Sequence, residues 1–511
     1  MNVVGIDVGG TNTDAVLMGN GRVLATFKNP TTPDVTAGIV GAVGGLIRSA
    51  GEAVRDVDAV MVGTTHFTNA VVQGFGLEPV GAVRIGLPAT AFLKPFVDWP
   101  DRLAAKVRAG IFMLEGGHEY DGRPLVPFDL DGMKAVAGQI VEAGLRSVAI
   151  TSVFSPLSAE CEELAEEILL GVCAEIDVTL SHRLGRIGLL PRENVALLNA
   201  SLRPLARMTV DAYVRAFSDS GLRAPLFITQ NDGTVMTAEF AERYPVYCFA
   251  SGPTNSMRGA AFLSGLQDAI VIDVGGTTTD IGFLRRGFPR EANSAVEIGG
   301  VRSLFRMPDL ISLPLGGGTI VHGNPFRLGP GSVGYELSTR AVLFGGADTT
   351  CTDIAVAEGL LRLGDPVNVA RLEASLRADT LIAIRTMVEQ AVDRMKPDAG
   401  DVPLVAVGGG AFLVPDDLPG ISEVLTVDHH DVANAVGAAI AQVSGEVDRV
   451  FQDLDREVAI ARATSMAEER ALEAGARASS LETVEVEDLP MAYLPGNSLR
   501  VRAKVVGDIA P

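Results

Sequence analysis

Two aspartates open two copies of one short sequence, and the residues around them suit phosphate chemistry. Residues 7–14 read DVGGTNTD, and residues 273–280 read DVGGTTTD. Glycines let the backbone approach a ligand closely, so that consecutive amide groups can surround an anion, and threonine hydroxyls add donors. An aspartate is repelled by phosphate, but it can hold Mg²⁺ through water. Two such loops facing each other would hold a polyphosphate from both sides, which is most of what phosphoryl transfer requires.

Each position of the two copies has a predicted role. Asp7 and Asp273 are the candidate catalytic residues and, through water, the candidate Mg²⁺ ligands. Asp14 and Asp280 either orient water or brace and cap their loops. The candidate phosphate donors are Gly9, Gly10, Thr11, Asn12 and Thr13 in the first copy and Gly275, Gly276, Thr277, Thr278 and Thr279 in the second. The alternative is a pair of tight turns with strand-initiating threonines, but a structural turn does not need the same spacing twice.

Two further glycine-rich segments extend the predicted nucleotide site. Gly408, Gly409 and Gly410 follow an apolar run and would let a flat group such as adenosine approach the backbone. Gly316 and Gly317 would face phosphate or substrate, although a bare turn fits them equally well. Each segment alone is weak evidence, because turns after strands often contain glycine.

Short strands joined by tight turns must position these residues. Each copy reads as a strand, a glycine turn, a second strand and a hairpin turn. The predicted strands are 2–7, 13–18 and 22–28 for the first copy and 269–273 and 279–284 for the second. β-forming residues follow each glycine loop, where a Rossmann or P-loop fold would begin a helix. We therefore exclude both of those folds.

The rest of the chain alternates between helical and strand-like patterns. An amphipathic helix is predicted at 375–395, where apolar residues recur on one face before Pro397. Further predicted helices are 34–50, 158–172, 428–443 and 456–478, and further predicted strands are 57–62, 149–153 and the segment from 483 onward. The 428–443 helix is rich in small residues, which suits close packing. We expect Asn434 and its small neighbours to have a structural role there.

Composition excludes several classes of protein. The chain has 511 residues and a formal net charge of -21, which disfavours nucleic acid as a partner. No apolar run approaches the ~18 residues of a membrane span, and no signal peptide precedes the first strand. The four cysteines show no CxxC spacing and read as buried or half-buried thiols in a reducing compartment. We expect a cytoplasmic α/β protein.

Other polar residues are weaker candidates for a site. His66 could contact a substrate, and the group around His118, with Glu119 and Asp121, forms a polar cluster. The adjacent histidines at 429–430, with Asp431, look like metal ligands, but adjacent histidines do not build a ligand face. For all of them a surface loop or a helix cap is the simpler interpretation. Cys351 lacks an identified base, so we expect a buried thiol there.

With its three glycine-rich sites in this order, the sequence resembles the actin, hexokinase and sugar-kinase ATPase superfamily. The resemblance makes 7–14 and 273–280 the two phosphate loops, 406–411 the adenosine loop and 431–442 a connecting helix. It implies two ribonuclease-H-like domains with ATP and Mg²⁺ in a cleft between them. We expect domains at 1–190 and 191–445, followed by a small C-terminal helix and strand segment at 446–511.

More narrowly, the chain resembles the hydantoinase/oxoprolinase family, of the HyuA subunit type. The resemblance rests on ordered motifs, namely GTTHFTNAVVQ (63–73), GGHEYDGRPLVP (116–127), SVFSP (152–156), LFITQNDG (226–233), SGPTNS (251–256), LGGGTI (315–320) and GGADTTCTDIAVAEG (345–359). Family members use ATP to phosphorylate a carbonyl oxygen, often that of a cyclic amide, so that water can open the ring. Related carboxylases phosphorylate a ketone enol and bicarbonate instead.

The resemblance leaves three functions open. The first is ATP- and Mg²⁺-dependent hydrolysis of a cyclic amide such as a hydantoin or lactam. The second is a subunit of an ATP-dependent ketone carboxylase, and the third is an ATP-driven switch that regulates or reactivates a partner. Fused oxoprolinases carry a large second half of the HyuB type, which this sequence lacks. We therefore expect a small carbonyl substrate and a second subunit of HyuB type or another partner chain.

Overall fold

The coordinates are a computed structural model of the chain. The structure describes residues 1–9, 11–30, 35–54, 56–184, 187–292, 296–303, 307–492 and 497–510. Gly10, one of the predicted phosphate donors, lies outside the described residues. No helix in these ranges is long and apolar enough to cross a membrane.

The first half of the chain is built on a sheet that starts with the first aspartate motif. Strands β1 (Asn2–Val8), β2 (Asn12–Gly19) and β3 (Arg22–Pro30) form an antiparallel meander. β4 (Ala59–Thr64) runs parallel to β1, and β9 (Leu226–Thr229) runs parallel to β4. The order β3-β2-β1-β4-β9 therefore places β1 at the centre, where both of its faces are buried.

The second half repeats this arrangement with the second aspartate motif. β11 (Ala269–Val274), β12 (Thr279–Arg285) and β13 (Phe288–Pro289) are antiparallel neighbours. β19 (Val402–Val407) and β20 (Ile421–Thr426) follow in parallel. The order β13-β12-β11-β19-β20 and its strand directions match the first sheet. Three antiparallel strands followed by two parallel ones are the ribonuclease-H pattern, so the predicted fold class is confirmed.

The hairpin turns that the sequence predicts have the expected backbone. Asn20 and Gly21 have φ angles of 51° and 70°, and Arg286 and Gly287 have φ angles of 52° and 75°. Positive φ at both central residues is typical of the tight turns that join twisted antiparallel strands. β16 (Leu310–Leu313) adds a further antiparallel strand beside β12.

Two helices from distant parts of the chain cross between the two sheets. α8 (Ser251–Ser264) precedes β11, and α13 (Ala433–Ala439) follows β20. A Cβ atom on Gly437 would overlap the backbone oxygen of Asn255, and one on Gly259 would overlap that of Ala433. The predicted close packing is therefore confirmed, because only glycine at these positions lets the helix backbones touch.

The small-residue helix is shorter than the sequence suggested. It ends at Ala439, and β21 (Gln442–Phe451) begins where the prediction continues the helix to residue 443. The reason is visible in β21, where buried and less buried residues alternate with the period of a strand rather than that of a helix.

The C-terminal residues extend the first sheet. β21 pairs with β10 (Thr234–Thr237), and β23 (Leu499–Gly507) lies between β21 and β22 (Glu482–Pro490). α14 (Arg456–Glu473) covers these strands with a row of buried alanines at a spacing of four, namely Ala459, Ala463, Ala467 and Ala471. The predicted helix and strands are present, while the domain boundaries at 190 and 445 stay predictions; β21 runs through residue 445.

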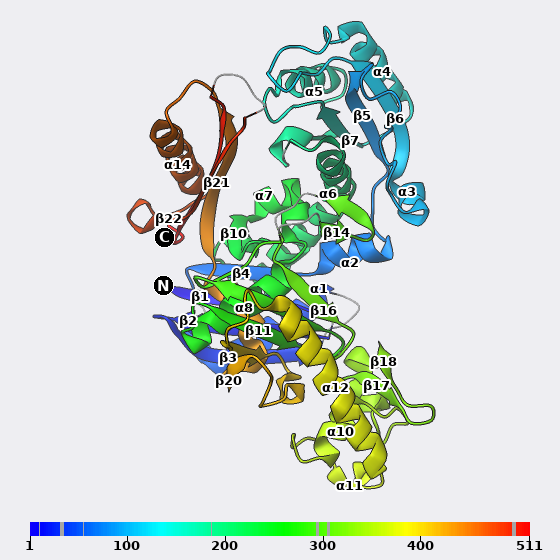
Figure 1. The fold of residues 1–511 in the computed structure, drawn as a ribbon, viewed down its shortest axis with the longest axis vertical. Helices are drawn as coiled ribbons and strands as arrows, with labels where there is room; N and C mark the ends of the chain where they lie inside the picture. Colours follow the sequence, from blue (N-terminus) through cyan, green and yellow to red (C-terminus); the bar gives the residue numbers. More distant parts are fainter. Residues whose placement is uncertain are drawn as a thin grey trace.

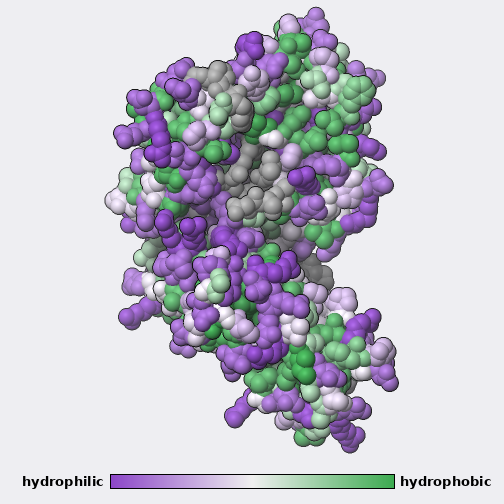
Figure 2. Space-filling view, in the orientation of Figure 1, coloured by the Kyte–Doolittle hydropathy of each residue, from purple (hydrophilic) through white to green (hydrophobic). Residues whose placement is uncertain are grey.

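A separate lobe is inserted into the first half. Its sheet is parallel throughout, in the order β6-β5-β7-β8, with β5 (Val80–Leu87), β6 (Arg108–Glu115), β7 (Ser147–Ser152) and β8 (Asp177–Leu180). α4 (Leu130–Glu142) and α5 (Glu160–Val172) pack on it, and the long α6 (Leu189–Asp219) leads back to the first half. Hydrophobic side chains gather on the visible face of this lobe, whereas the middle of the molecule is mostly hydrophilic (Figure 2).

The second half carries its own insertion at the opposite end of the molecule (Figure 1). The amphipathic helix predicted at 375–395 is α12 (Ala374–Met395), which buries Ile384, Val388 and Val392. Beside it lie α9 (Leu337–Arg340), α10 (Cys351–Ala357), α11 (Pro366–Val369), β17 (Thr319–His322) and β18 (Arg327–Ser332). Smaller elements elsewhere are α1 (Val35–Ala50), α2 (His66–Gln73), α3 (Asp101–Val107), α7 (Ala238–Arg243), β14 (Val296–Ile298) and β15 (Val301–Ser303).

Candidate active site

The turns of the two repeated hairpins meet in space. A Cβ atom on Gly276, in the turn between β11 and β12, would lie 3.0 Å from Oγ1 of Thr11, in the turn between β1 and β2. The charge of Asp273 also acts on Asp7, which places the two candidate carboxylates near each other. The two motifs are therefore parts of one site, although their first aspartates, Asp7 and Asp273, lie 266 positions apart in the sequence.

In the first hairpin, one amide side chain joins two carboxylates. Asp7 and Asp14 lie opposite each other on β1 and β2. Nδ2 of Asn434, at the start of α13, donates to Asp7 at 3.1 Å and to Asp14 at 3.0 Å. Asn255 of α8 donates to the other oxygen of Asp7 at 3.3 Å, and the Lys28 ammonium lies 2.9 Å from Asp14. Two helices and a strand thus fix this carboxylate pair.

In the second hairpin, hydroxyl groups take the place of the amides. Asp273 and Asp280 lie opposite each other on β11 and β12. Ser256 Oγ donates to Asp273 at 2.5 Å, and Ser312 of β16 donates to Asp280. Ser256 follows Asn255 directly in the sequence. Adjacent residues of α8 therefore contact the first aspartate of each hairpin.

Burial shifts the protonation of these carboxylates. Removal from water, with the charge of Asp14 as the next contribution, raises the pKa of Asp7 to about 7. Burial is also the main cause that raises the pKa of Asp273 to about 6, and it raises the pKa values of Asp14 and Asp280. Low-dielectric surroundings disfavour the charged form of a carboxylate. The site therefore favours an added cation.

The donor set fits Mg²⁺ bound largely through water. The side chains around the two hairpins offer carboxylate, amide and hydroxyl oxygens, which are the ligands of a hard cation. The buried Thr13 Oγ1 and Asn255 Oδ1 have no hydrogen-bond partner. In the described ranges no three His, Cys, Asp or Glu side chains form a group able to hold a metal ion by themselves. An ion that keeps several waters and uses few carboxylates is consistent with both observations.

The loop residues of the two copies divide into exposed and buried positions. Each turn closes with the same bond, from the Gly9 amide to the Asn12 oxygen at 3.0 Å and from the Gly275 amide to the Thr278 oxygen at 2.9 Å. Thr277 is exposed, as is Thr278, and Thr11 and Asn12 are partly exposed. Thr13 and Thr279 are buried instead, and the Thr279 hydroxyl donates to the Leu315 oxygen at 2.7 Å. Their role as phosphate donors stays a prediction.

Both remaining glycine segments pack against the second hairpin. The amides of Gly317 and Gly318 donate to the oxygens of Gly275 and Gly276 at 3.0 and 2.7 Å, and the Gly316 amide donates to Thr319 at 2.8 Å. These amides are therefore already engaged within the protein. A contact of this segment with phosphate or substrate would need other atoms and stays a prediction.

The segment at 408–410 lies against the end of β11. Gly408 has a φ angle of 86°, and a Cβ atom on it would overlap Oδ1 of Asp273. The Gly410 amide donates to the Val274 oxygen at 2.8 Å, while no atom would lie within 4 Å of a Cβ on Gly409. The predicted adenosine loop is therefore adjacent to the second carboxylate and open on one side. Its nucleotide contacts stay a prediction.

Sequence reasoning missed Asn255, Ser256 and Asn434. Asn255 and Ser256 lie in SGPTNS, a segment that the sequence offered only as a family motif. Asn434 was expected to have a structural role, whereas it bonds both carboxylates of the first hairpin. A polar amide in a helix of otherwise small, buried residues is the signal that could have identified it.

Most of the weaker candidates lie outside this site, although the backbone oxygen of Asp431 accepts from Lys28 at 2.8 Å. His118 is 4% exposed, so the expectation of a surface loop is wrong for it; its ring packs inside the inserted lobe, 3.8 Å from Glu160. His430 Nδ1 lies 3.0 Å from the Val427 oxygen in a short turn. Cys351 is buried, as expected, and burial raises its pKa. His66 is half-buried against Phe67 and Phe75, and burial lowers its pKa.

Comparison with known proteins identifies the family of the chain. Residues 3–173 match the model of the hydantoinase/oxoprolinase N-terminal region, and residues 192–365 match the model of hydantoinase/oxoprolinase. The caprolactamase subunit alpha of Pseudomonas jessenii is 25% identical over 420 residues, covering 75% of this chain and 57% of that protein. The acetophenone carboxylase gamma subunit of Aromatoleum aromaticum is 25% identical over 423 residues, covering 74% and 56%.

Solved structures agree on the fold. The crystal structure of an ATP-dependent caprolactamase from Pseudomonas jessenii superposes with a TM-score of 0.76 at 18% identity, covering 99% of this chain and 88% of that one. The chain spans less than two thirds of the length of the curated relatives that it matches in sequence. The two family models together match more than half of the residues. The chain belongs to the hydantoinase/oxoprolinase family.

Proposed function

We propose that this chain is the ATP-dependent subunit of an enzyme that activates the carbonyl group of a cyclic amide for hydrolysis. The observation that carries the proposal is the contact between Thr11 and Gly276, which brings the two repeated carboxylate hairpins into one site. Electrostatic stabilisation and positioning are the main requirements of phosphoryl transfer, and two facing hairpins supply both. The ATP-dependent caprolactamase of the same family supports the choice of reaction.

ATP binds, in this proposal, with its phosphates between the two turns. The exposed hydroxyls of Thr277 and Thr278 and the partly exposed Thr11 and Asn12 donate to the phosphate oxygens. The open side of Gly409 admits the adenosine. Asn434 and Asn255 hold Asp7 in place, and Ser256 holds Asp273, so that the carboxylates do not need to reorganise during the reaction.

Asp7 and Asp273 hold Mg²⁺ through water. The metal supplies positive charge that neutralises the phosphates when it is bound. Asn434 keeps the carboxylates of Asp7 and Asp14 oriented, and Lys28 balances part of the charge of Asp14. Without a cation, Lys28 is the one basic side chain that the described residues place against the four carboxylates of the two hairpins, which fits the raised pKa values of Asp7 and Asp273.

The proposed reaction transfers the γ-phosphoryl group of ATP to the amide oxygen. The bond between that oxygen and phosphorus forms as the bond between phosphorus and the leaving oxygen of ADP breaks. A first water then adds to the activated carbon and the ring carbon–nitrogen bond breaks, so that the nitrogen leaves as an amine, taking up a proton, and an acyl phosphate remains. A second water adds to the same carbon, the carbon–oxygen bond to phosphate breaks, and phosphate leaves. The products are ADP, phosphate and the opened amino acid.

A second chain completes the enzyme in this proposal. Several relatives are named as subunits, among them the alpha subunit of caprolactamase and the gamma subunit of acetophenone carboxylase. We place the hydrolytic step on a partner of HyuB type and the phosphoryl transfer on this chain. Purification of the protein from its native cells would show whether such a partner accompanies it.

The second candidate function is phosphoryl transfer to a ketone enol for carboxylation. The similarity to an acetophenone carboxylase subunit favours it, at the same identity as the similarity to caprolactamase. The two reactions share the paired hairpins and differ in the carbon substrate. Bicarbonate separates them, because only carboxylation consumes it.

ATP turnover in the presence of small carbonyl compounds tests the proposal. The native complex is assayed with lactams, hydantoins and ketones, each with and without bicarbonate. Stimulation by a cyclic amide without bicarbonate is the expected result. Stimulation only by a ketone with bicarbonate would favour the carboxylase. An ATP turnover rate that no carbonyl compound changes would contradict both functions.

A further inference from the structure

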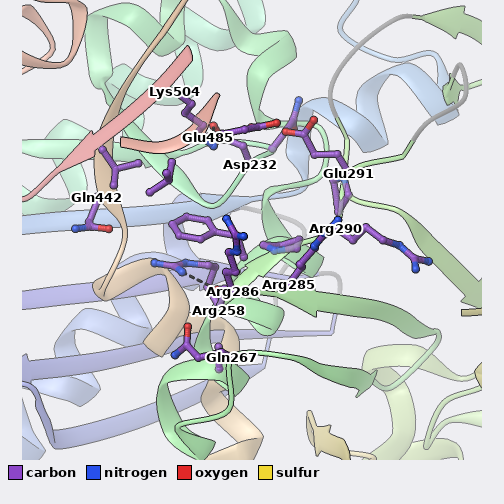
Figure 3. A pocket seen from close by; sticks show the side chains of 18 of the residues that line it. Asp232, Arg258, Gln267, Arg285, Arg286, Arg290, Glu291, Gln442, Glu485 and Lys504 are labelled. Carbon is purple, nitrogen blue, oxygen red and sulfur yellow. Dashed lines mark hydrogen bonds and ion pairs between the residues drawn. The ribbon is translucent and has the colours of Figure 1, made fainter. Parts of the chain in front are cut away.

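A pocket of about 1030 Å³ lies away from the paired hairpins, between the second sheet and the C-terminal strands (Figure 3). One wall is the turn between β12 and β13, and the opposite wall is formed by β22 and β23. Arg285 ends β12, and Thr279 begins it next to the glycine turn. Seven residues of strand at ~3.3 Å each put the pocket about 20 Å from the second turn. Arg285 and Arg286 are therefore remote from the second turn, whereas Arg258 lies on α8 two residues after Ser256.

Both acidic and basic side chains line the pocket, and its five carboxylates are those of Asp232, Glu291, Glu482, Glu485 and Glu487. The chain has 42 lysines and arginines and a net charge of -21. Six of these cations line this one pocket, namely Arg258, Arg285, Arg286, Arg290, Arg502 and Lys504. Three of them already have carboxylate partners: Lys504 lies 2.6 Å from Asp232, Arg502 lies 2.9 Å from Glu291, and Arg290 lies 2.8 Å from Asp309.

Arg258 has its side chain fixed but its charge unmatched. Its guanidinium lies 3.9 Å from the centre of the Phe288 ring and donates to the Gly287 oxygen at 2.7 Å. Its Nε is buried and has no hydrogen-bond partner. Asp232 is the acid that acts on it, but that carboxylate is already engaged by Lys504 and Thr234. A partly buried cation that lacks its own counter-ion carries a desolvation cost, and a bound anion relieves that cost.

Arg285 and Arg286 stand beside Arg258 on the same wall. Both side chains are exposed, and for neither of them does the described part of the chain show an ion pair. The three arginines lie on one side of the pocket, while Asp232, Glu485 and Lys504 lie on the other (Figure 3). The planar fork of a guanidinium group matches the paired oxygens of a carboxylate or a phosphate.

We propose that Arg258, Arg285 and Arg286 form a binding site for a small anionic ligand that carries carboxylate or phosphate groups. Arg258 is the preorganised anchor, and the two exposed arginines complete the site from the turn. The site is independent of the proposed ATP reaction, and the proposal concerns binding alone.

Titration calorimetry with succinate, inorganic phosphate and pyrophosphate tests this site. The double variant Arg285→Ser/Arg286→Ser is compared with wild type and with Arg22→Ser/Arg223→Ser, which removes two exposed arginines that do not line the pocket. All titrations are repeated in Asp7→Ala, because pyrophosphate can also occupy the paired hairpins. Succinate tests for binding of carboxylate groups, and inorganic phosphate and pyrophosphate test for binding of phosphate groups.

We expect at least one of these anions to bind wild type and to bind about tenfold more weakly to Arg285→Ser/Arg286→Ser, the equivalent of about 1.4 kcal/mol. The surface double variant keeps wild-type binding of the same anion, and any change of binding in Asp7→Ala is assigned to the paired hairpins rather than to this pocket. Arg258→Gln, checked by its unfolding temperature, also weakens it. Absence of binding to wild type, or equal binding to both double variants, would overturn the proposal. Neither result depends on ATP turnover.

Discussion

The two hairpins have the same sequence motif and the same strand order, but different neighbours hold their aspartates. The first pair, Asp7 and Asp14, shares the amide of Asn434 and has Lys28 as a counter-ion. The second pair has only hydroxyl donors, Ser256 and Ser312, among the side-chain bonds that the described residues show. The duplication therefore supplied the carboxylates, and segments outside the two copies supplied their partners.

One feature is common to both hairpins. In each half, a glycine lies against the first aspartate. In the first half it is Gly63 of β4, and in the second half it is Gly408, directly after β19. A Cβ atom on Gly63 would overlap Oδ1 of Asp7, and a Cβ atom on Gly408 would overlap Oδ1 of Asp273. Each carboxylate is thus confined on one side by a position that tolerates no side chain. In both halves a glycine confines the first aspartate, but the side chains that donate hydrogen bonds to that aspartate differ.

The largest effect should come from removing either first aspartate. Asp7→Ala and Asp273→Ala should each lower carbonyl-stimulated ATP turnover by about 10²- to 10³-fold, because each hairpin supplies one side of the phosphate site. Folding should remain, since the lost carboxylate is buried and costly to desolvate. Turnover assays with circular dichroism as the folding control measure both. Wild-type turnover in one variant would mean that the hairpins are not equivalent partners.

Because a glycine lies against the first aspartate of each hairpin, replacing that glycine with alanine should lower the stability of the fold. Gly408→Ala should lower the free energy of unfolding by about 1–3 kcal/mol, because the added methyl group meets Asp273 and the backbone has a positive φ. Gly63→Ala should have a similar effect in the first half. Gly409→Ala is the matched control and should stay within about 0.5 kcal/mol of wild type. Chemical denaturation measures all three, and equal values for Gly408→Ala and Gly409→Ala would refute the confinement.

Because different donors hold the two aspartates, removing those donors should lower turnover by different amounts. Asn434→Ala removes the group that bonds two carboxylates and should lower turnover about tenfold, by an effect of roughly 1–2 kcal/mol. Ser256→Ala removes a single bond to Asp273 and should have a smaller effect. The comparison uses turnover at saturating ATP. A larger loss in Ser256→Ala would reverse the assignment of the first hairpin as the more strongly braced one.

Glu162, a buried carboxylate outside the site, has its pKa shifted in the direction opposite to that of the hairpin aspartates. Burial alone would raise the pKa of Glu162, but its bond to His182 at 2.7 Å and the charges of His182 and Arg192 hold that pKa below its ordinary value of 4.5. A depressed folded-state pKa adds stability above the unfolded pKa, and this stability is lost as pH falls below about 4.5.

Glu162→Gln should therefore lose less unfolding free energy on acidification than wild type does. Glu163→Gln, an exposed neighbour on the same helix, is the control and should follow wild type. Denaturation at a series of pH values measures the difference. Identical pH profiles for Glu162→Gln and wild type would show that this carboxylate does not stay charged in the folded protein.

The local structure of the site was predictable, because the repeated motif and the hairpin signals lie within short segments. β1, β2, β11 and β12 form within one or two residues of their predicted bounds. The partners were not predictable in this way. Asn434 reaches Asp7 because α13 packs directly on β1, where a Cβ atom on Gly5 would overlap the backbone oxygen of Ala435, a contact between segments far apart in sequence.

The boundary between α13 and β21 was missed for a related reason. The residues before Gln442 are small and compatible with a helix, and local propensity alone does not end one there. Pairing of β21 with β10 and β23 converts the following residues into a strand. Tertiary contacts thus decide both the end of the helix and the position of Asn434 at its start.

The stoichiometry of nucleotide binding tests the central claim most directly. Calorimetric titration of MgATP into wild type, Asp7→Ala, Asp273→Ala and the double variant measures whether two hairpins serve one ligand. We predict one nucleotide per chain, a similar loss of affinity in each single variant and little further loss in the double variant. Two nucleotides per chain, or undiminished binding in either single variant, would contradict a shared site.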